Sequence, residues 1–359
     1  MLKAYKYRLY PNKEQKRKLN ETLWLCSVVY NRCLAERRDA WKNEQRSLTA
    51  YDQIKQLPIW KKEDPRLNQV YSQVLQDVVR RVDKAFQAFF RRVKAGEKPG
   101  YPRFKSARRY DSFTYPQSGF QLQNGRLKLA KIGLVKIKLH RPLQGKVKTL
   151  TIRRQAGGWY ACFSVEVDPA VLPPSNKAVG VDLGLESFAI TSDGEFFPSA
   201  RYLRKSERKL KQLQRMVSRR QKGSHRRQKA VRQLAKAHAH VANQRRDMAH
   251  KVARSLVNRY GLIAVEDLNV KGMLKNHHLA KSISDAGWNL FVTILKAKAA
   301  EAGRQVIEVD PRNTSQDCSG CGALVPKPLS QRWHDCPHCG TSLHRDVNAA
   351  RNILQKAVA

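Results

Sequence analysis

The chain has 359 residues, and its 70 lysines and arginines outnumber its 29 aspartates and glutamates, giving a formal net charge of +41. It contains no apolar run of about 18 residues that could span a membrane, and its first residues lack the apolar core of a secretory signal, so we expect a soluble, cytoplasmic protein without a membrane partner. A positive charge of this size predicts a polyanionic partner such as nucleic acid, but ribosomal proteins share it, and catalysis does not follow from it.

The first 96 residues are expected to begin with a strand and to continue as helices. Alternating apolar and basic residues from Ala4 to Tyr10 predict the strand. Apolar residues at steps of three and four then predict helices, the second starting at about Leu67. The side chains of Tyr51, Gln73 and Gln76 on these helices are of the kind that reads base edges, although ordinary solvated helix positions would look the same.

From about Gly100 the sequence changes to short apolar runs separated by turn-forming glycines, which indicates β structure. We expect a small barrel or sandwich with a basic surface. Because the first predicted strand lies far upstream, we interpret the helices as an insertion into one discontinuous β domain. The proline-containing segment from Asp168 to Lys177 is typical of a linker.

The apolar strand that begins at Ala178 contains an aspartate, Asp182. An aspartate in such a strand is costly unless a cation or a hydrogen-bonding loop offsets its charge. Gly184, two positions further on, leaves room for the backbone of a substrate to approach. Taken alone, Asp182 fits a metal ligand and a turn residue equally well.

Residues 201–259 are strongly basic and predict a pair of long helices interrupted at Gly223 and Ser224. We expect this hairpin to face phosphates, with a solvated charged helix as the alternative. The segment from Leu262 to Asn269 is a second apolar strand that ends in acids, of which Glu266 is the first. A helix and a further strand are expected between residues 285 and 309.

Two C-x-x-C pairs near the end of the chain predict a metal site. Cys318 with Cys321, and Cys336 with Cys339, have the spacing of zinc-ribbon knuckles. Disulfide bonds are the alternative, but they are uncommon in a chain that lacks a secretory signal. Four thiolates would fill a tetrahedral coordination sphere, so the zinc is expected to be structural. The chemistry must come from other residues, and Asp346, at the start of a last predicted helix, is a candidate.

Asp182, Glu266 and Asp346 stand out by their contexts rather than by their number. If folding brings them together, they could hold two Mg²⁺ ions about 4 Å apart, or Mn²⁺ in their place. One ion would activate water and the other would stabilise the leaving 3′ oxygen of a phosphodiester. This is nuclease chemistry, and the order Asp, Glu, Asp on strand, strand and helix fits the RNase H-like arrangement of RuvC nucleases.

Segments spread over nearly the whole chain resemble the TnpB family, the transposon-encoded relatives of type V CRISPR effectors. These segments are K-Y-R-L-Y-P, Y-P-R-F-K, S-F-T-Y-P, G-V-D-L-G-L, V-E-D-L-N-V, T-S-Q-D-C-S-G-C-G, C-P-H-C-G and R-D-V-N-A-A-R-N-I. The resemblance implies an RNA-guided DNA endonuclease, in which a transposon-derived guide RNA pairs with the target strand. The protein would read a short motif beside the target, and one RuvC site would cut both strands of double-stranded DNA.

The resemblance also implies roles for individual residues. By position, the nuclease acids of the family fall on Asp182, Glu266 and Asp346. The family's zinc ligands fall on Cys318, Cys321, Cys336 and Cys339. The candidates for contacts with the flanking DNA motif are Tyr51, Gln73, Gln76 and Thr114. The implied protein is a monomer with one guide RNA, associated with the nucleoid of a bacterium or archaeon.

The implied fold class is multidomain α+β. Residues 1–12 and 97–174 are expected to form a wedge-like β-barrel domain, and residues 13–96 an inserted helical recognition domain. Residues 175–359 are expected to form an RNase H-like (RuvC) α/β nuclease domain, with a zinc ribbon inserted at 313–343.

Three alternatives are compatible with parts of this pattern. A DDE transposase shares the fold, but its acids usually run Asp, Asp, Glu. A RuvC-type junction resolvase shares the acids, but it has no use for a recognition bundle and a zinc ribbon of this type. A nuclease-inactive, RNA-guided DNA-binding repressor would have lost an acid. All three acids are present here, which favours an active nuclease.

Overall fold

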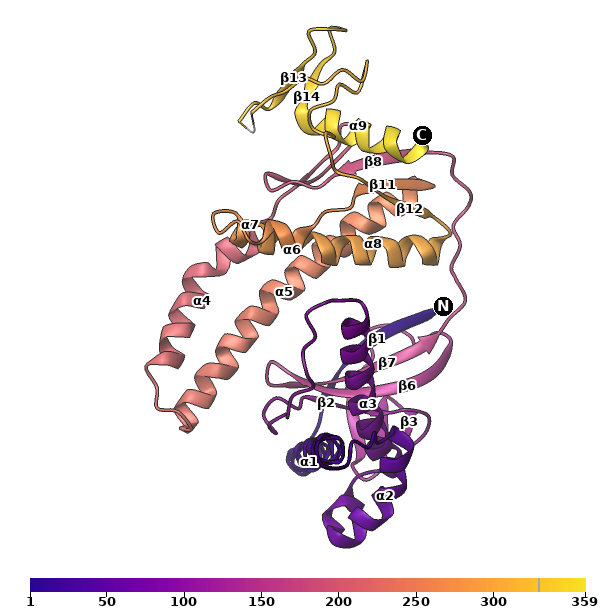
Figure 1. The fold of residues 1–359 in the computed structure, drawn as a ribbon, viewed down its shortest axis with the longest axis vertical. Coiled ribbons are helices and arrows are strands. Elements are labelled where there is room, and N and C mark those ends of the chain that lie inside the picture. The colour runs from indigo at the N-terminus through magenta and orange to yellow at the C-terminus, as the bar shows by residue number, and fades with distance from the viewer. Residues whose placement is uncertain (329) are drawn as a thin grey trace. The chain divides into compact units, whose positions relative to one another are not determined.

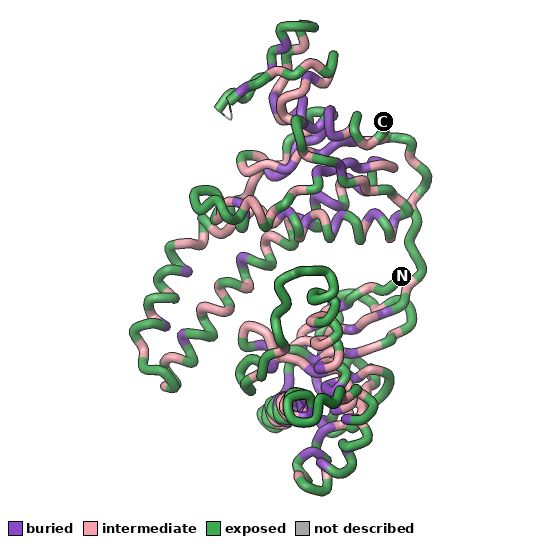
Figure 2. Tube along the Cα trace, viewed as in Figure 1, coloured by how far each residue is buried: buried purple, intermediate pink, exposed green. Residues whose placement is uncertain are grey.

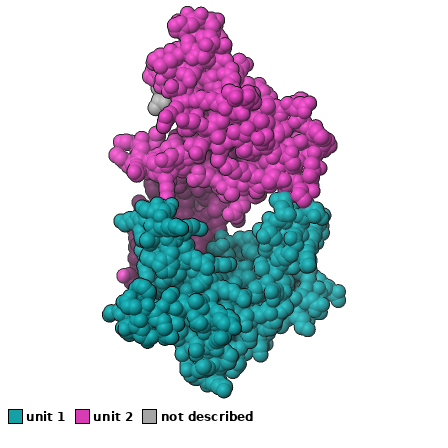
Figure 3. Space-filling view, turned by 45° about the vertical axis from the view of Figure 1, so that its right-hand side comes forward, with its two compact units in different colours: residues 1–168 teal, residues 169–359 magenta. Residues whose placement is uncertain are grey.

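The computed structural model describes residues 1–328 and 330–359, which form two compact units, Met1–Asp168 and Pro169–Ala359 (Figures 1 and 3). The division falls at the start of the proline-containing segment that was expected to be a linker. No helix in the described part of the chain is long and apolar enough to cross a membrane. The fold is a mixture of α and β structure in both units.

Unit 1 is built on a seven-stranded antiparallel sheet of order β2-β6-β7-β1-β5-β4-β3. The strands are β1 (Leu2–Tyr10), β2 (Ser112–Tyr115), β3 (Phe120–Gln123), β4 (Arg126–Leu129), β5 (Gly133–Lys138), β6 (Lys146–Gln155) and β7 (Gly158–Glu166). The first strand of the chain lies inside the sheet, because β1 pairs with both β5 and β7. Strands β2 and β3 lie at the two edges, and closure into a barrel stays a prediction.

The helices of unit 1 come between β1 and β2 in the chain. They are α1 (Lys13–Glu44), α2 (Ala50–Glu63), the short 3₁₀ helix η1 (Pro65–Gln69) and α3 (Ser72–Lys94). Capping boxes at Asn12 and Thr49 fix the starts of α1 and α2 by satisfying their free backbone N–H groups. The apolar faces of the helices and the sheet share one hydrophobic core.

Unit 2 is built on a five-stranded sheet of order β10-β9-β8-β11-β12. The strands are β8 (Ala178–Asp182), β9 (Ser187–Thr191), β10 (Phe196–Pro198), β11 (Leu262–Glu266) and β12 (Gln305–Val309). The central strand β8 runs parallel to β11, and β11 runs parallel to β12. Strands β9 and β10 complete the other side of the sheet as antiparallel neighbours.

Helices cover both faces of the unit 2 sheet (Figure 1). One face packs against α5 (His225–Arg259) and α8 (Trp288–Ala302), and the other packs against α9 (Arg345–Val358). Because side chains alternate along a strand, Val179 and Val181 of β8 point to the α5 and α8 face. Gly180 and Asp182 therefore point to the α9 face. Figure 2 shows buried positions concentrated on the strands and on the helix sides that meet them.

The basic stretch between β10 and β11 forms an antiparallel hairpin of α4 (Tyr202–Ser218) and α5, broken at Gly223 as expected. Residues 201–259 hold 20 lysines and arginines and two acids. Two short helices, α6 (Val270–Met273) and α7 (Ala280–Ala286), precede α8, which begins three residues later than the expected start. Gly287, in the left-handed conformation, ends α7 and starts the new helix. A two-stranded ribbon, β13 (Trp333–Asp335) with β14 (Ser342–His344), leads into α9.

Candidate active site

Asp182 and Glu266 end two neighbouring parallel strands of the unit 2 sheet. Val181 pairs with Val265 in the register of β8 and β11, so the two acids that follow lie side by side at the carboxyl ends of the strands. Asp346 comes from the first turn of α9, and α9 packs on the face of the sheet toward which Asp182 points. The structure therefore brings the three sequence-predicted acids to one end of one sheet, although Asp346 is 164 positions from Asp182 in the sequence.

The first turn of α9 is positioned by His344, which sequence inspection did not single out as a cap. Its Nδ1 accepts a hydrogen bond from the backbone N–H of Asp346 at 3.2 Å. The imidazole ring packs edge-on against Phe196 of β10, with the ring centroids 5.0 Å apart. The start of α9 is thus fixed to the sheet on the side where the acids gather.

Gly180 allows α9 to approach the sheet closely. A Cβ at this position would lie 1.9 Å from the carbonyl oxygen of Ala350 and 2.8 Å from the backbone nitrogen of Leu354. Both atoms belong to the backbone of α9, so no side-chain movement could relieve the clash. The absence of a side chain at Gly180 therefore sets the height of the helix over β8, and with it the distance from Asp346 to Asp182.

We expect Gly180→Ala to move α9 away from β8. Overpacking of this kind costs about 1–3 kcal/mol of stability. A displacement of about 1 Å would lower a metal-dependent nuclease activity by roughly 10²-fold. The matched control is Gly100→Ala, because a Cβ there meets no heavy atom within 4 Å and should leave the melting temperature unchanged. A Gly180→Ala protein with wild-type melting temperature and cleavage rate would contradict this account of the helix position.

The charges of the three acids repel each other. Burial raises the pKa of Asp182 well above its usual range, and the neighbouring carboxylates of Glu266 and Asp346 raise it further. Burial also raises the pKa of Glu266, whose side chain is only 8% exposed. A divalent cation bound to these carboxylates would lower the pKa values of Asp182 and Glu266, because it favours the charged form of each carboxylate. Carboxylate oxygens are the ligands that hard divalent cations such as Mg²⁺ prefer, so the chemistry of these three side chains suits such an ion.

Two side chains hold Glu266 toward its charged form. The buried hydroxyl of Thr314 donates a hydrogen bond to Glu266 Oε1 at 2.6 Å, and the positive charge of Lys356 also lowers the pKa of Glu266. The charge of Glu266 in turn raises the pKa of Asp182. Thr314 lies in the T-S-Q-D segment that leads into the cysteine cluster, so this segment contributes directly to the site.

Two buried asparagines on α9 connect the acid site to the cysteine cluster. Asn352 Nδ2 donates to the backbone carbonyl groups of Thr314 and Asp317, at 2.8 and 2.6 Å. Asn348 Nδ2 also donates to Asp317, at 2.7 Å, and its Oδ1 accepts from the N–H of Ser319 at 2.9 Å. The spacing of four residues places both amides on one face of the helix. This role was not predicted, although the N-x-x-x-N spacing in R-D-V-N-A-A-R-N is visible in the sequence.

The four predicted zinc ligands do come together. The Sγ atoms of Cys318, Cys321, Cys336 and Cys339 all lie within 4.8 Å of one another. The distances Cys318 Sγ to Cys339 Sγ and Cys321 Sγ to Cys336 Sγ are both 3.6 Å, far too long for disulfide bonds. Four thiolates at about 2.3 Å from a tetrahedral zinc ion would lie about 3.8 Å apart, so the arrangement fits this ion.

A glycine after each C-x-x-C pair forms the two knuckles. Gly322 and Gly340 have φ angles of 76° and 70°, a left-handed conformation that glycine adopts without strain. Their N–H groups donate to the carbonyl groups of Cys318 and Cys336, at 2.8 and 3.0 Å, which closes the same tight turn twice. Hydrogen bonds from Thr341 lower the pKa of Cys339, which favours the thiolate form that binds metal.

The four candidates for flanking-motif contacts lie in unit 1. Tyr51 is 65% exposed on α2, with the Lys55 ammonium 4.4 Å from the centre of its ring. Gln73 and Gln76 lie on α3, partly buried. The hydroxyl of Thr114 already bonds to Arg81 Nη2 at 2.6 Å and to Thr151 Oγ1 at 2.8 Å. Tyr51 is therefore the most accessible of the four, and their role in DNA contacts stays a prediction.

Comparison with known proteins gives full-length relatives. A Streptomyces pristinaespiralis protein named "Putative RNA-guided DNA endonuclease" is 37% identical over 99% of this chain and 90% of its own length. An Escherichia coli K12 protein of the same name, InsQ, is 33% identical over 98% of this chain and 92% of its own. Family models match residues 162–277, described as a probable transposase, and residues 288–353, described as a Cas12f1-like TNB domain. The chain belongs to the TnpB family.

The TnpB resemblance predicted from the motifs is thus confirmed. A third family model, described as a helix-turn-helix domain, matches residues 1–46, where this TnpB chain has the strand β1 and the single long helix α1. The fold is also similar to Cas12f1 in a cryo-EM structure of a Cas12f1-sgRNA-target DNA complex. The TM-score is 0.61 at 13% identity over 98% of both chains, which is a likeness of fold.

Proposed function

We propose that this protein is an RNA-guided DNA endonuclease encoded by a transposon, which cuts double-stranded DNA beside a short flanking motif. The observation that carries the proposal is the meeting of Asp182, Glu266 and Asp346 at one end of the unit 2 sheet, in a chain whose full-length relatives are named for this activity. The net charge of +41 supplies the attraction for both nucleic acids. Its partners would be a guide RNA from the transposon end and target DNA, bound by one protein monomer in the nucleoid of its host.

The reaction we propose is hydrolysis of a phosphodiester bond. Asp182, Glu266 and Asp346 would hold two Mg²⁺ ions, with Mn²⁺ as a substitute. The bound metal supplies an activated water and neutralises the charge that develops on the leaving 3′ oxygen. Thr314 and Lys356 favour the charged form of Glu266 against the effect of burial, while His344 and Gly180 set the position of Asp346.

The proposal also assigns a role to each domain. Residues 175–359 would be the RuvC-type nuclease domain, which is supported by acids on strand, strand and helix, with a structural zinc ribbon at 313–343. Residues 1–12 and 97–174 would be the wedge-like barrel domain, and residues 13–96 the recognition domain. Base pairing with the guide would read the target, while Tyr51, Gln73, Gln76 and Thr114 would contact the flanking motif.

One relative supports a second candidate function. A protein of Allomeiothermus silvanus named "CRISPR-associated DNA-binding protein Cas12m" is 30% identical over 32% of this chain. RNA-guided binding without cleavage is therefore the alternative. The three carboxylates of this chain favour the nuclease, because only a complete set of acids can hold a metal pair. A junction resolvase would instead cut four-way junctions without any guide.

The deciding experiment is cleavage of a DNA library with randomised flanks. The protein is purified with its co-expressed RNA, the RNA is sequenced, and a matching target is added in Mg²⁺. We expect guide-dependent cutting beside one enriched flank. Guide-dependent binding without cutting would favour the repressor, and cutting of four-way junctions without RNA would favour the resolvase. Absence of both RNA and target preference would reject RNA guidance.

A further inference from the structure

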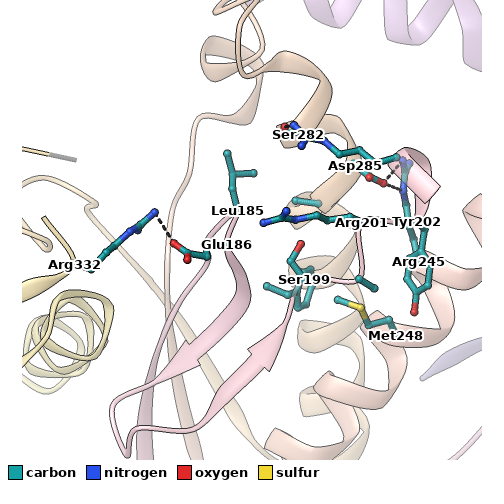
Figure 4. A pocket seen from close by; sticks show the side chains of 14 residues that line it. Leu185, Glu186, Ser199, Arg201, Tyr202, Arg245, Met248, Ser282, Asp285 and Arg332 are labelled. Atoms are coloured by element: carbon teal, nitrogen blue, oxygen red, sulfur yellow. Dashed lines mark hydrogen bonds and ion pairs between the residues drawn. The ribbon is translucent and has the colours of Figure 1, made fainter. Parts of the chain in front are cut away.

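A cavity of about 260 Å³ lies in unit 2 (Figure 4). It is lined by the loop after β8, at Leu185 and Glu186, and by the segment between β10 and α4, at Ser199 and Arg201. Residues of α5 and α7 complete the wall. Leu185 is only three positions after Asp182, so one wall of the cavity belongs to the loop that follows this candidate metal ligand.

The two carboxylates in the cavity wall already have partners. Asp285, which is 9% exposed, accepts the N–H of Leu203 with both of its oxygens at 3.1 Å. It also accepts two hydrogen bonds from Arg245, at 2.9 and 2.6 Å. Glu186 forms an ion pair with Arg332, with 2.6 Å between Glu186 Oε2 and Arg332 Nη2 (Figure 4). Both acids are therefore matched by one arginine each, and neither has to neutralise a further cation.

Two other arginines in the wall have no acidic partner among residues 1–328 and 330–359. Arg204 Nη2 donates only to the neutral hydroxyl of Ser282, at 3.1 Å. The Arg201 side chain makes no hydrogen bond or ion pair with the described part of the chain, and Figure 4 shows it extending toward Leu185. The cavity therefore carries an excess of positive charge, which an anion would neutralise.

The backbone of Arg201 is strained. Its φ and ψ are both 46°, a left-handed conformation that costs free energy for any residue with a Cβ. Glycine would avoid this cost, yet an arginine occupies the position and directs an unpaired guanidinium at a cavity. The amino end of α4 also lies at the cavity, where the Asp285 carboxylate already caps it through the N–H of Leu203. The unpaired charge and the strained backbone of Arg201 therefore indicate a site for an anion.

We propose that this cavity binds one backbone phosphodiester of a nucleic-acid strand, with Arg201 as the main contact and Arg204 beside it. A guanidinium forms paired hydrogen bonds with phosphate oxygens. The basic α4–α5 hairpin starts at the cavity, so a strand that follows the hairpin would end there. The identity of the ligand rests on the proposed function. The bound phosphate would hold the strand at the loop that follows Asp182.

The test combines protein variants with single uncharged linkages. Methylphosphonate groups are placed one at a time in the target strand, the non-target strand or the guide RNA, and affinity is measured in an Asp182→Ala background that leaves DNA uncut. Arg201→Gln removes the charge, and Arg201→Gly also removes the backbone strain. Arg254→Gln on the exposed side of α5 is the matched control for the loss of one charge.

We expect one linkage whose neutralisation weakens binding about tenfold in the parent and has no further effect in either Arg201 variant. The effect of Arg254→Gln on binding affinity should be additive with the effect of that linkage. The strand that contains the coupled linkage identifies the source of the phosphate. Arg201→Gly should bind more weakly while melting at the same temperature as the parent or higher, which a purely structural arginine would not do.

The proposal would be overturned if the effects of Arg201→Gln and Arg201→Gly on binding affinity were additive with the effect of every uncharged linkage. This failure is distinguishable from a failure of the proposed function. Intact guide-dependent cleavage without any coupled linkage would remove only the phosphate site. A coupled linkage in a protein that binds but does not cut would keep the phosphate site and remove the nuclease.

Discussion

Asp182→Asn is expected to lower metal-dependent DNA cleavage by at least about 10³-fold, equivalent to about 4 kcal/mol of transition-state stabilisation. Asparagine keeps the size of the side chain but loses the charge that holds the metal pair. Binding of guide RNA and target DNA should stay within about twofold of wild type, because the site carries little of the contact with either strand. The measurement is single-turnover cleavage with gel-shift binding in parallel. Asp247→Asn, an exposed acid paired with Lys251, is the matched control and should cut normally.

The same variant should stabilise the metal-free protein at neutral pH. The pKa of Asp182 is raised in the folded state by burial and by Glu266 and Asp346, so the folded protein holds this proton more tightly than the unfolded chain does. Stability from this group is complete below the unfolded pKa and is lost as the pH rises through the folded value. At pH 8 in EDTA, Asp182→Asn should therefore melt a few degrees above wild type.

This difference should shrink as the pH falls and the wild-type carboxyl becomes protonated. Mg²⁺ should raise the melting temperature of wild type, because binding to the folded state alone is stabilising, and should have little effect on Asp182→Asn. Metal affinity of the wild type should rise with pH, since metal and protons compete for the same oxygens. Equal melting temperatures of the two proteins in EDTA at all pH values would contradict the repulsion described for the acids.

Cys336→Ser has the second large expected effect. The side chain is 4% exposed, and its Sγ lies 3.6 Å from Cys321 Sγ. We expect the zinc content to fall from about one ion per chain to near zero, measured by atomic emission. Zinc binding in small ribbons is worth roughly 10–16 kcal/mol, so the cysteine cluster should lose its fold without it.

The loss of zinc should also disturb the site formed by the three acids. Asn348 and Asn352 bind the segment that leads into Cys318, and Thr314 in that segment bonds to Glu266. Zinc removal should therefore reduce cleavage as well as thermal stability of unit 2. Cys162→Ser, in β7 of unit 1, is the matched control and should keep full zinc content. Unchanged zinc content and unchanged melting of Cys336→Ser would reject the metal assignment.

Much of the local structure could be predicted from the sequence because it depends on short-range patterns. Alternation predicted β8 and β11, the turn at Gly223 divided the basic helices, and the C-x-x-C-G spacing indicated two knuckles. The residues at which helices begin and end were harder to predict from the sequence. The region around Leu67 became a 3₁₀ helix and α3 began only at Ser72, because Pro65 starts a separate short turn that the three- and four-residue pattern did not reveal.

The charge, the types of metal ligand and the family could be inferred from the sequence, since these depend on which residues are present and how they are spaced. How far the acids converge is visible only in the folded chain, because their meeting depends on strand order, on parallel pairing of β8 with β11 and on the contact of Gly180 with α9. The hydrogen bonds of Thr314, Asn348 and Asn352 are likewise visible only in the folded chain. Their partners are 29 or more positions away in the sequence, and a buried hydrogen bond over that separation leaves no local pattern.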